Sequence, residues 1–315
     1  MDEFALIQRF FTRRPRRKDT FVGIGDDGAL LSPPEGEAVV ATMDTLVENV
    51  HFFPEVAPED LGHKALAVNL SDLAAMGARP GWAFLALTLP KADEAWLESF
   101  ANGLLSLADE FNVDLAGGDT TRGPLTVTLQ ALGFVKASLA LKRSGAKVGD
   151  GIYVSGTLGS AGLGLKILQQ QISWPDPAAE ERLLRPTPRV RLGIALRGLA
   201  HACIDISDGL AADLYHILNA SDVGARVEFD RLPLNKGVKR YIAETGDWQM
   251  PLTAGDDYEL CFTMPPEKEP NLAASLQNSG VTWHRIGIIE QQSGLRLYKG
   301  GKVTVLSPAG YQHFS

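Results

Sequence analysis

Segments with strand character alternate with segments with helical character along this chain, and the alternation begins twice. In the first half, a β-branched stretch at 38–46 precedes a long, mostly apolar helix expected over 58–78. A segment rich in Gly and charge at 142–151 interrupts the pattern, and the alternation restarts after it. This organisation predicts an α/β (α+β) fold made of two α/β domains, residues 1–141 and 142–315.

The remaining elements follow from the same patterns. The expected helices are 2–11, 58–78, 93–111, 160–171, 189–200, 209–220 and 270–278. The expected strands are 21–31, 38–46, 82–89, 113–116, 125–135, 152–155, 203–206, 224–229, 258–264, 282–288, 295–298 and 302–306.

Composition excludes several classes of protein. The chain is 45% hydrophobic and 22% charged, which is sufficient for a large core. Its formal net charge of −8 makes nucleic-acid binding a poor prospect, and no apolar run is long enough to cross a membrane. Cys203 and Cys261 are too few for a disulfide framework, so we expect buried thiols in a cytoplasmic protein.

A local basic run stands out against the acidic average. It comprises Arg13, Arg14, Arg16, Arg17 and Lys18 around a proline. We expect a solvated arm, with steering of phosphates as the alternative.

Two glycine-rich segments imitate nucleotide-binding motifs. Gly23, Gly25 and Gly28 have the spacing of a dinucleotide fingerprint, but two prolines follow closely and prevent the helix that this motif requires. The segment 155–166 has P-loop-like spacing but carries Leu165 at the lysine position. We expect a tight strand-to-helix turn there, with a phosphate-binding backbone as the alternative.

Aspartates at the ends of expected elements are the candidates for chemistry. They are Asp26, Asp27, Asp44, Asp72, Asp119, Asp205, Asp208, Asp256 and Asp257. Taken singly, most would serve as turn or capping residues, and Asp208 is placed to cap a helix. Asp72 is different because it lies within an apolar helix, where a carboxylate needs a cation or hydrogen-bond donors.

These groups together offer hard oxygen ligands without a histidine or cysteine cluster. Such a set suits Mg²⁺, which commonly connects carboxylates to substrate phosphates. Several Mg²⁺ ions would let an acidic protein bind ATP, and phosphoryl transfer is the reaction class that such a site favours. The same aspartates could instead form turns in a non-catalytic scaffold.

Six motifs occur in a fixed order and, as a set, resemble the thiamine-monophosphate kinase family, within the superfamily that includes aminoimidazole ribonucleotide synthetase. They are G-I-G-D-D-G, T-M-D-T-L-V-E-N-V-H-F, L-A-V-N-L-S-D-L-A-A-M-G-A, G-G-D-T, I-D-I-S-D-G-L and G-D-D-Y-E-L. The resemblance implies that the N-terminal sheet pairs with that of a second protomer in a homodimer. It also implies that ATP and Mg²⁺ lie between the two domains.

The resemblance also assigns roles to individual residues. The positions implied for metal binding are Asp27, Thr42, the carbonyl of Met43, Asp44, Asp72, Asp119, Asp205 and Asp208. The positions implied for ATP are Gly118, Asp119, Arg143 and Ser207, and those for thiamine monophosphate are His51, Glu259 and Tyr311. The chain departs from the family pattern at Asn49, where Gly is common, and at Tyr311, where Trp is common.

The resemblance therefore predicts ATP- and Mg²⁺-dependent phosphorylation of thiamine monophosphate to thiamine diphosphate. The alternatives are an ATP-dependent synthetase of the same superfamily acting on a purine-precursor amide, and a non-enzymatic binding protein. We expect direct in-line transfer without a catalytic side chain, because the acceptor phosphate is already anionic and needs no general base. What the reaction needs is relief from repulsion between two anions.

Overall fold

The computed structural model describes residues 2–311 and 313, and the chain divides into two compact units. The first contains the chain up to Leu73 together with Ala78–Ser138. The second contains Ala74–Gly77 and the chain from Leu139 onward. Residues 74–77 group with the second unit because the Leu141 amide donates to the Met76 carbonyl and Arg197 donates to the Gly77 carbonyl.

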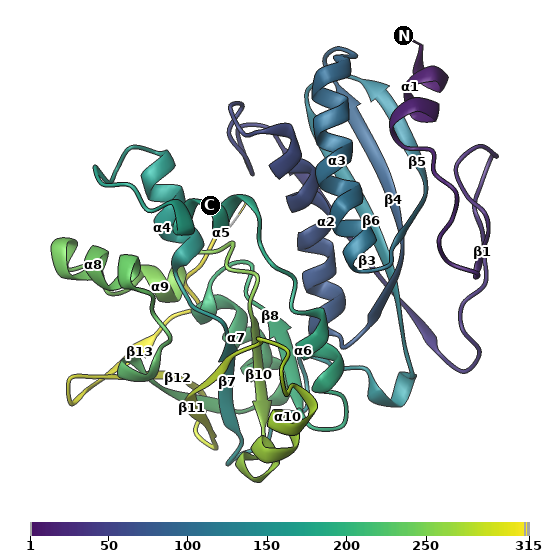
Figure 1. The fold of residues 1–315 in the computed structure, drawn as a ribbon. Coiled ribbons are helices and arrows are strands. Elements are labelled where there is room, and N and C mark those ends of the chain that lie inside the picture. The colour runs from purple at the N-terminus through teal and green to yellow at the C-terminus, as the bar shows by residue number, and fades with distance from the viewer. Residues whose placement is uncertain (1, 312, 314–315) are drawn as a thin grey trace. The chain divides into compact units, whose positions relative to one another are not determined.

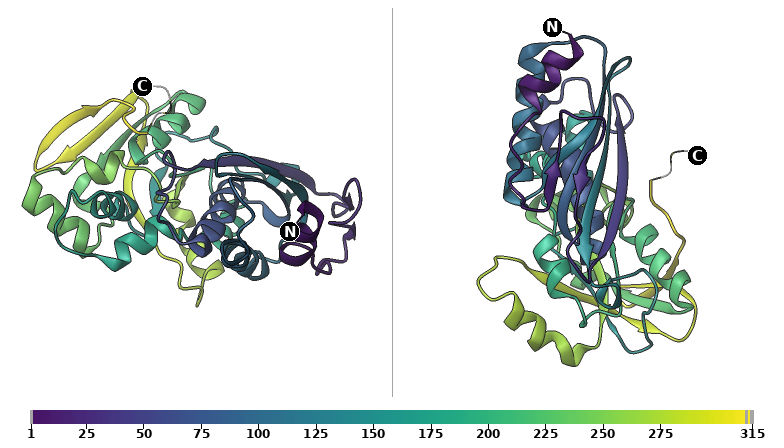
Figure 2. Two further views of the ribbon diagram at one scale, coloured as in Figure 1. Left: turned by 90° about the horizontal axis from the view of Figure 1, so that it is seen from above. Right: turned by 90° about the vertical axis from the view of Figure 1, so that its right-hand side faces the viewer.

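The first unit is a four-stranded sheet covered by helices. The sheet has the order β3 (Ala38–Val47), β6 (Thr126–Val135), β4 (Arg79–Leu89), β5 (Asp114–Arg122). The helices are α1 (Glu3–Phe10), α2 (Pro58–Ala75) and α3 (Glu94–Glu110), and a short antiparallel pair is formed by β1 (Thr20–Val22) and β2 (Leu30–Leu31). Figures 1 and 2 show α2 and α3 on one face of this sheet. Strands β4 and β5 are parallel, whereas β6 is antiparallel to both of its neighbours.

The second unit is built on a seven-stranded mixed sheet. Its order is β13 (Lys302–Leu306), β12 (Gly294–Lys299), β9 (Gly224–Glu228), β11 (Trp283–Glu290), β7 (Gly151–Ser155), β10 (Leu260–Met264), β8 (Ala202–Asp205). Its helices are α4 (Ser160–Leu168), α5 (Pro177–Leu184), α6 (Val190–Ala195), α7 (Leu210–Ser221), α8 (Lys236–Thr245), α9 (Met250–Thr253) and α10 (Glu269–Ser275). Short 3₁₀ turns occupy Ala137–Leu139, Phe229–Arg231 and Pro266–Lys268. Among the strands described in this sheet, β12 and β9 are parallel, and the other neighbouring strands pair antiparallel.

The α/β architecture expected from the sequence is confirmed, although several elements differ locally from the expectation. The expected strand 21–31 is two short strands, because the glycine-rich stretch between them forms a turn. The expected strand 113–116 extends to Arg122, because its polar half pairs with β4. Helices α5, α8 and α9 were not anticipated, although Asp176 and Asn235 cap the first two in the usual way.

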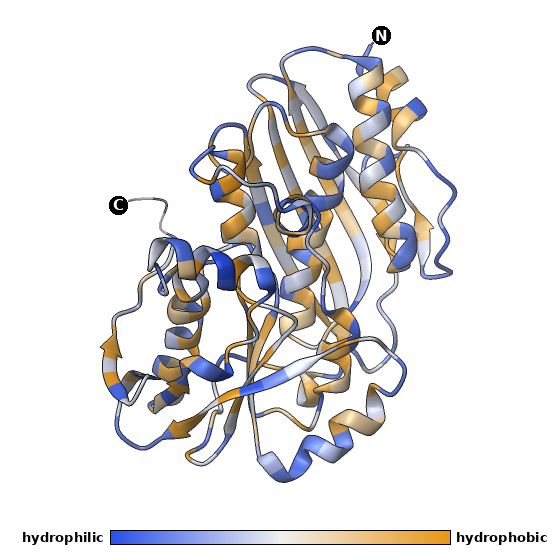
Figure 3. Ribbon diagram, turned by 60° about the vertical axis from the view of Figure 1, so that its left-hand side comes forward, coloured by the Kyte–Doolittle hydropathy of each residue, from blue (hydrophilic) through white to orange (hydrophobic). Residues whose placement is uncertain are grey.

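Apolar side chains fill the interior of each unit. Figure 3 shows hydrophobic colour along the strands of both sheets. In the second unit the core joins Ile204, Ile217, Ala225 and Ile286 from four elements. Cys203 and Cys261 are free, buried thiols, as expected. Within the described residues, no helix combines the length and apolarity that a membrane span requires.

Candidate active site

In the first unit, strand β3 and helix α2 bring three of the expected metal-site residues together. Alternation along β3 turns Thr42 and Asp44 toward the side of Val40 and Leu46, while the Met43 side chain is 59% exposed on the opposite face. The Thr42 hydroxyl donates a short hydrogen bond to Asp72 Oδ2. The structure therefore places two carboxylates and one hydroxyl at a common point.

The electrostatics of Asp44 differ from those of a surface carboxylate. Burial, and after it the negative charge of Asp72, raises its pKa from 3.8 to about 6. Its Oδ2 atom is buried and has no hydrogen-bond partner among the described residues. A buried, unpartnered carboxylate oxygen beside a second carboxylate is a suitable ligand for a hard cation such as Mg²⁺.

Two further residues expected at this site, Asp27 and Asp119, are exposed. The Asp27 amide bonds to Asp26 within its own loop. Asp119 follows Gly118, which has φ +148°, and a Cβ on Gly118 would lie 1.8 Å from the Leu85 carbonyl oxygen. Glycine is thus required before Asp119. In the part of the chain that the structure describes, no three acidic, histidine or cysteine side chains are grouped as a metal site.

The loop after β3 holds His51 by its backbone and its ring. The Val47 amide donates to His51 Nδ1 at 3.0 Å, and the His51 amide donates to the Val47 carbonyl at 2.9 Å. Asn49 in the same loop has φ +64°, a conformation that glycine adopts freely and asparagine tolerates. This explains how Asn can stand at a position where Gly is common.

In the second unit, sheet topology explains why distant motifs meet. Strands β7 and β8 are both antiparallel to β10, so the ends of β7 and β8 lie at the same edge as the start of β10. Asp256 and Tyr258 both have positive φ, and their amides donate to the Ser207 and Ile206 carbonyls. The I-D-I-S-D-G and G-D-D-Y-E-L motifs are therefore joined directly, and the joint holds two residues in an unfavourable backbone conformation.

Asp205 and Asp208 lie at this edge, but Asp208 does not cap α7 as the sequence suggested. The capping position is Gly209, and the carboxylate of Asp213 accepts the amides of Asp208 and Gly209, at 3.1 Å each. Burial raises the pKa of Asp213 to about 7, with the Asp208 charge as the next cause. Asp208 is left half-buried, and burial raises its pKa despite the opposing charges of His216, His313 and Arg143.

The glycine-rich segment 155–166 forms the tight strand-to-helix turn that the sequence predicted. Its amides already have an acceptor, because Asp257 receives hydrogen bonds from Gly159 and Ala161 at 2.6 and 3.2 Å. Burial raises the pKa of Asp257 to about 7. An internal carboxylate thus occupies the place where a P-loop would hold phosphate.

Glu259 is fully buried and belongs to a charged cluster. Its carboxylate accepts hydrogen bonds from Arg182, Arg189 and the Ser155 hydroxyl. Burial acts to lower the pKa of Arg189, but the hydrogen bonds and the charge of Glu259 outweigh it and raise that pKa. These partners differ from the substrate contact that the resemblance implied for Glu259.

The C-terminal segment lies against the Asp208 loop. The Tyr311 amide donates to the Asp208 carbonyl at 3.1 Å, and a Cβ on Gly310 would lie 2.5 Å from the same oxygen. The Tyr311 ring is 47% exposed and meets His313 edge to face. The expected substrate residue Tyr311 is therefore held beside the expected metal ligand Asp208.

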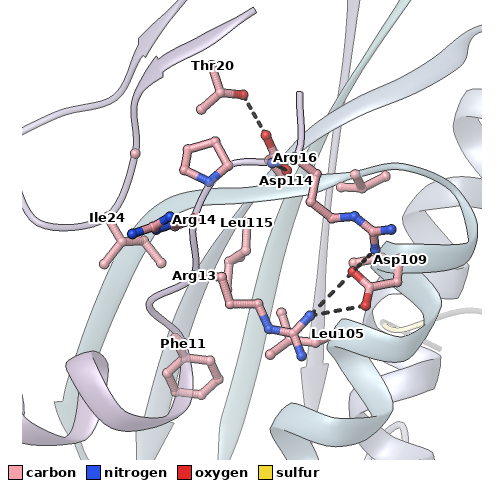
Figure 4. A pocket seen from close by; sticks show the side chains of 14 residues that line it. Phe11, Arg13, Arg14, Arg16, Thr20, Ile24, Leu105, Asp109, Asp114 and Leu115 are labelled. Atoms are coloured by element: carbon pink, nitrogen blue, oxygen red, sulfur yellow. Dashed lines mark hydrogen bonds and ion pairs between the residues drawn. The ribbon is translucent and has the colours of Figure 1, made fainter. Parts of the chain in front are cut away.

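The basic run borders a shallow hollow in the first unit, drawn in Figure 4. Arg13 and Arg16 both pair with Asp109, while Arg14 lies on the other side beside Ile24. Arg17 is buried and paired with Asp19. Asp114 accepts from the Arg16 and Arg17 amides and from Thr20. Much of the run thus fastens the N-terminal segment to α3 and β5, a structural role that the sequence did not suggest.

Sequence reasoning missed three residues that shape this edge of the second unit: Asp213, Arg182 and Arg189. Asp213 was visible as an acid shortly after a glycine turn, which is a signal for amide capping. The arginines carried no such signal, because only the folded chain brings their helices to Glu259.

Comparisons with known proteins match both halves of the chain. Residues 25–135 match the family described as AIR synthase related protein, N-terminal domain, and residues 147–300 match the corresponding C-terminal domain. The chain is 48% identical over 319 residues to thiamine-monophosphate kinase of Escherichia coli K12, covering 99% of this chain and 98% of the relative.

Two solved structures are similar to this chain over most of its length. Thiamine-monophosphate kinase from Stenotrophomonas maltophilia K279a is 46% identical with a TM-score of 0.87, covering 94% of this chain and 96% of that one. AaThiL, solved in complex with AMPPCP and TMP, is 32% identical with a TM-score of 0.79, covering 92% of each chain.

Proposed function

Because the chain belongs to the thiamine-monophosphate kinase family of AIR synthase related proteins, we propose that it transfers the γ-phosphoryl group of ATP to thiamine monophosphate, yielding thiamine diphosphate. The observation that carries the proposal is full-length similarity to kinases of this name, at 48% identity in one case. A 32% identical relative solved with AMPPCP and TMP supports the pairing of nucleotide and acceptor.

Magnesium is the metal that the donor set favours. Asp44 and Asp72 with the Thr42 hydroxyl would hold it in the first unit, and the unpartnered Asp44 oxygen supports this assignment. We assign Asp205 and Asp208 the same role in the second unit, and Asp27, Asp119 and the Met43 carbonyl remain proposed ligands. When bound, the metal neutralises charge on the phosphates and so lowers the repulsion between donor and acceptor.

The remaining site residues are proposed to orient the two substrates. Gly118, Asp119, Arg143 and Ser207 are assigned to ATP, with Arg143 as a guanidinium partner for phosphate. His51 is assigned to the acceptor, and the hydrogen bond from the Val47 amide to its Nδ1 atom fixes the orientation of its ring. Tyr311 offers an exposed ring face to the cationic heterocycle of thiamine monophosphate.

Transfer is proposed to be direct and in line. The acceptor phosphate is anionic at neutral pH, so the protein need not remove a proton from it. The contribution of the chain is to align the two phosphates and to compensate their charge. Free thiamine would present a neutral hydroxyl and is proposed to be a negligible acceptor.

We further propose that the protein is a cytoplasmic homodimer. The outer face of β3 exposes Val39 and Met43, at 45% and 59%, and a second sheet would cover such a face. Free, buried thiols suit a reducing compartment. A monomeric mass by light scattering at micromolar concentration would contradict the dimer.

A product assay tests the function. The protein is incubated with ATP, Mg²⁺ and thiamine monophosphate, with thiamine and an aminoimidazole precursor amide in parallel reactions. We expect thiamine diphosphate and ADP in equal amounts, and loss of product when EDTA removes the metal. Turnover of the precursor amide alone would instead indicate a synthetase.

A further inference from the structure

Asn69 is a polar residue inside α2 with a side-chain oxygen that lacks a hydrogen-bond donor. The residue is 0% exposed, and its Nδ2 atom donates to the Ala65 carbonyl, one turn earlier, at 3.1 Å. Its Oδ1 atom is buried and accepts no hydrogen bond from the described residues. Asparagine is a poor helix former, and a buried acceptor without a donor costs free energy. The Asn69 oxygen therefore needs a donor from outside the chain.

The direction of α2 places Asn69 on the same side of the Thr42–Asp72 hydrogen bond as Asp44. Strands β3 and β4 are both antiparallel to β6, so they are parallel to each other, and α2 connects them. A helix that returns from the end of one parallel strand to the start of the next runs opposite to the strands. From the contact of Thr42 with Asp72, two residues forward along β3 advance ~7 Å to Asp44. Three residues back along α2 advance ~4.5 Å in the same direction, to Asn69.

The side chains also face one another. Asn69 and Asp72 share a face of α2, because residues three apart in a helix are neighbours. Thr42 and Asp44 share the face of β3 that contacts α2, because residues two apart in a strand point the same way. In the described part of the first unit, the side-chain polar atoms that are buried without a partner are Asp44 Oδ2 and Asn69 Oδ1. Both are oxygens, and both border this region, which indicates one common ligand.

The two oxygens suit different parts of a hydrated cation. Mg²⁺ is bound by one or two carboxylates and keeps several water molecules, whose protons are hydrogen-bond donors. Asp44 and Asp72 supply the carboxylates, whereas the neutral amide oxygen of Asn69 suits a hydrogen bond from a metal-bound water. The bond from Nδ2 to the Ala65 carbonyl fixes the amide group, so that Oδ1 is the atom left to accept. Residues that hydrogen-bond to metal ligands orient those ligands and raise metal affinity.

We propose that Asn69 is a positioning residue of the first-unit metal site, and that its Oδ1 atom accepts a hydrogen bond from a water molecule on the cation held by Asp44 and Asp72. The inference rests on the magnesium site of the proposed function and adds a residue to it. Asn69 then determines metal affinity through a metal-bound water rather than by contact with either substrate.

The test measures Mn²⁺ binding to the full-length protein by electron paramagnetic resonance at saturating AMPPCP, with Mn²⁺ as the probe in place of Mg²⁺. Asn69→Ala and Asn69→Leu both remove the oxygen, and either serves if the other fails to fold. We expect each to weaken Mn²⁺ binding at least about 10-fold at one class of site. Asn69→Asp keeps an acceptor oxygen and adds a charge, so it should bind Mn²⁺ more tightly than Asn69→Ala. Ser71→Ala, which alters another 0% exposed polar residue of α2, is the matched control and should leave Mn²⁺ affinity unchanged.

Thermal unfolding with and without metal separates this role from a purely structural one. If Asn69 acts on the metal, its alanine variant shows a smaller rise in melting temperature on addition of Mg²⁺ and AMPPCP than the wild type. A lower melting temperature in EDTA with an unchanged rise on addition of metal would overturn the inference. Wild-type Mn²⁺ affinity in the alanine and leucine variants, or equal weakening in Asn69→Asp and Asn69→Ala, would also overturn it. So would the absence of Mn²⁺ binding by the wild type.

The product assay tests the proposed function separately. Failure of the wild type to form thiamine diphosphate would refute the kinase activity, while Mn²⁺ binding that depends on Asn69 would still support the metal site. Normal formation of thiamine diphosphate by the wild type, together with unchanged Mn²⁺ affinity in the variants, would refute only the role of Asn69.

Discussion

The negative charges of buried carboxylates are compensated by different groups in the two units. In the first unit, Asp44 and Asp72 lie close together, and the described donor between them is the Thr42 hydroxyl. In the second unit, the buried carboxylates of Asp213, Asp257 and Glu259 have donors from the protein itself. Asp213 and Asp257 accept backbone amides, and Glu259 accepts two guanidiniums.

Asp44 and Asp72 therefore form a group that needs a cation to compensate its charge, whereas Asp213, Asp257 and Glu259 already have hydrogen-bond donors within the protein. A buried carboxylate without donors is costly, so its persistence beside another carboxylate is explained by a ligand outside the chain. A carboxylate with a full set of donors contributes to local structure and orients its donors instead. Substitution of Asp44 or Asp72 should therefore affect mainly catalysis, whereas substitution of Asp213, Asp257 or Glu259 should affect mainly stability.

Asp72→Asn gives the largest expected effect. We expect kcat to fall about 10³-fold, because the substitution removes one charged ligand from the site where charge must be compensated. The melting temperature should stay the same or rise, since the repulsion with Asp44 disappears. Steady-state kinetics and thermal unfolding measure both, with Glu98→Gln on the exposed face of α3 as control. Near-normal kcat at saturating Mg²⁺ would refute the metal assignment.

Glu259→Gln should produce the opposite pattern. Loss of the charge leaves two largely buried guanidiniums without a counter-ion, and we expect a loss of about 3 kcal/mol in the free energy of unfolding. Urea unfolding measures this loss. A stability equal to that of the wild type would show that the cluster is not internally balanced as described.

Asp257 should make stability depend on pH. Its pKa is raised from 3.8 to about 7, so the native state binds more protons than the unfolded state between these values. The contribution of Asp257 to the free energy of unfolding is therefore greatest below about pH 4. It falls as the pH rises toward 7, with a slope of up to about 1.4 kcal/mol per pH unit. Asp257→Asn should flatten the curve in unfolding experiments at several pH values. An identical slope in the two proteins would contradict the assignment.

Tyr311→Ala should give the smallest effect. Loss of an exposed aromatic face is expected to raise KM for thiamine monophosphate about 5-fold, corresponding to roughly 1 kcal/mol, with little change in KM for ATP. Tyr311→Trp should preserve or lower that KM. If the alanine variant instead raises KM for ATP alone, the ring does not belong to the acceptor site.

Local patterns determined much of this protein. Alternating strand and helix signals were enough for two α/β domains, because periodicity and turn residues act over a few positions. Prolines after the G-I-G-D-D-G motif excluded a nucleotide-binding helix for the same reason. An aspartate within the apolar helix α2 marked Asp72 before any contact was known. The resemblance of six motifs in order then identified the family, which the comparisons confirmed.

Only the tertiary structure decided which charges meet. Asp208 was expected to cap α7, but Asp213 takes the amides, and the distinction depends on the turn geometry at Gly209. Strand β5 extends through polar residues because a neighbouring strand pairs with it. Arg182 and Arg189 reach Glu259 across about 70 residues of chain. Such contacts depend on sheet topology and burial, which are properties of the whole fold, and no local pattern in the sequence specifies them.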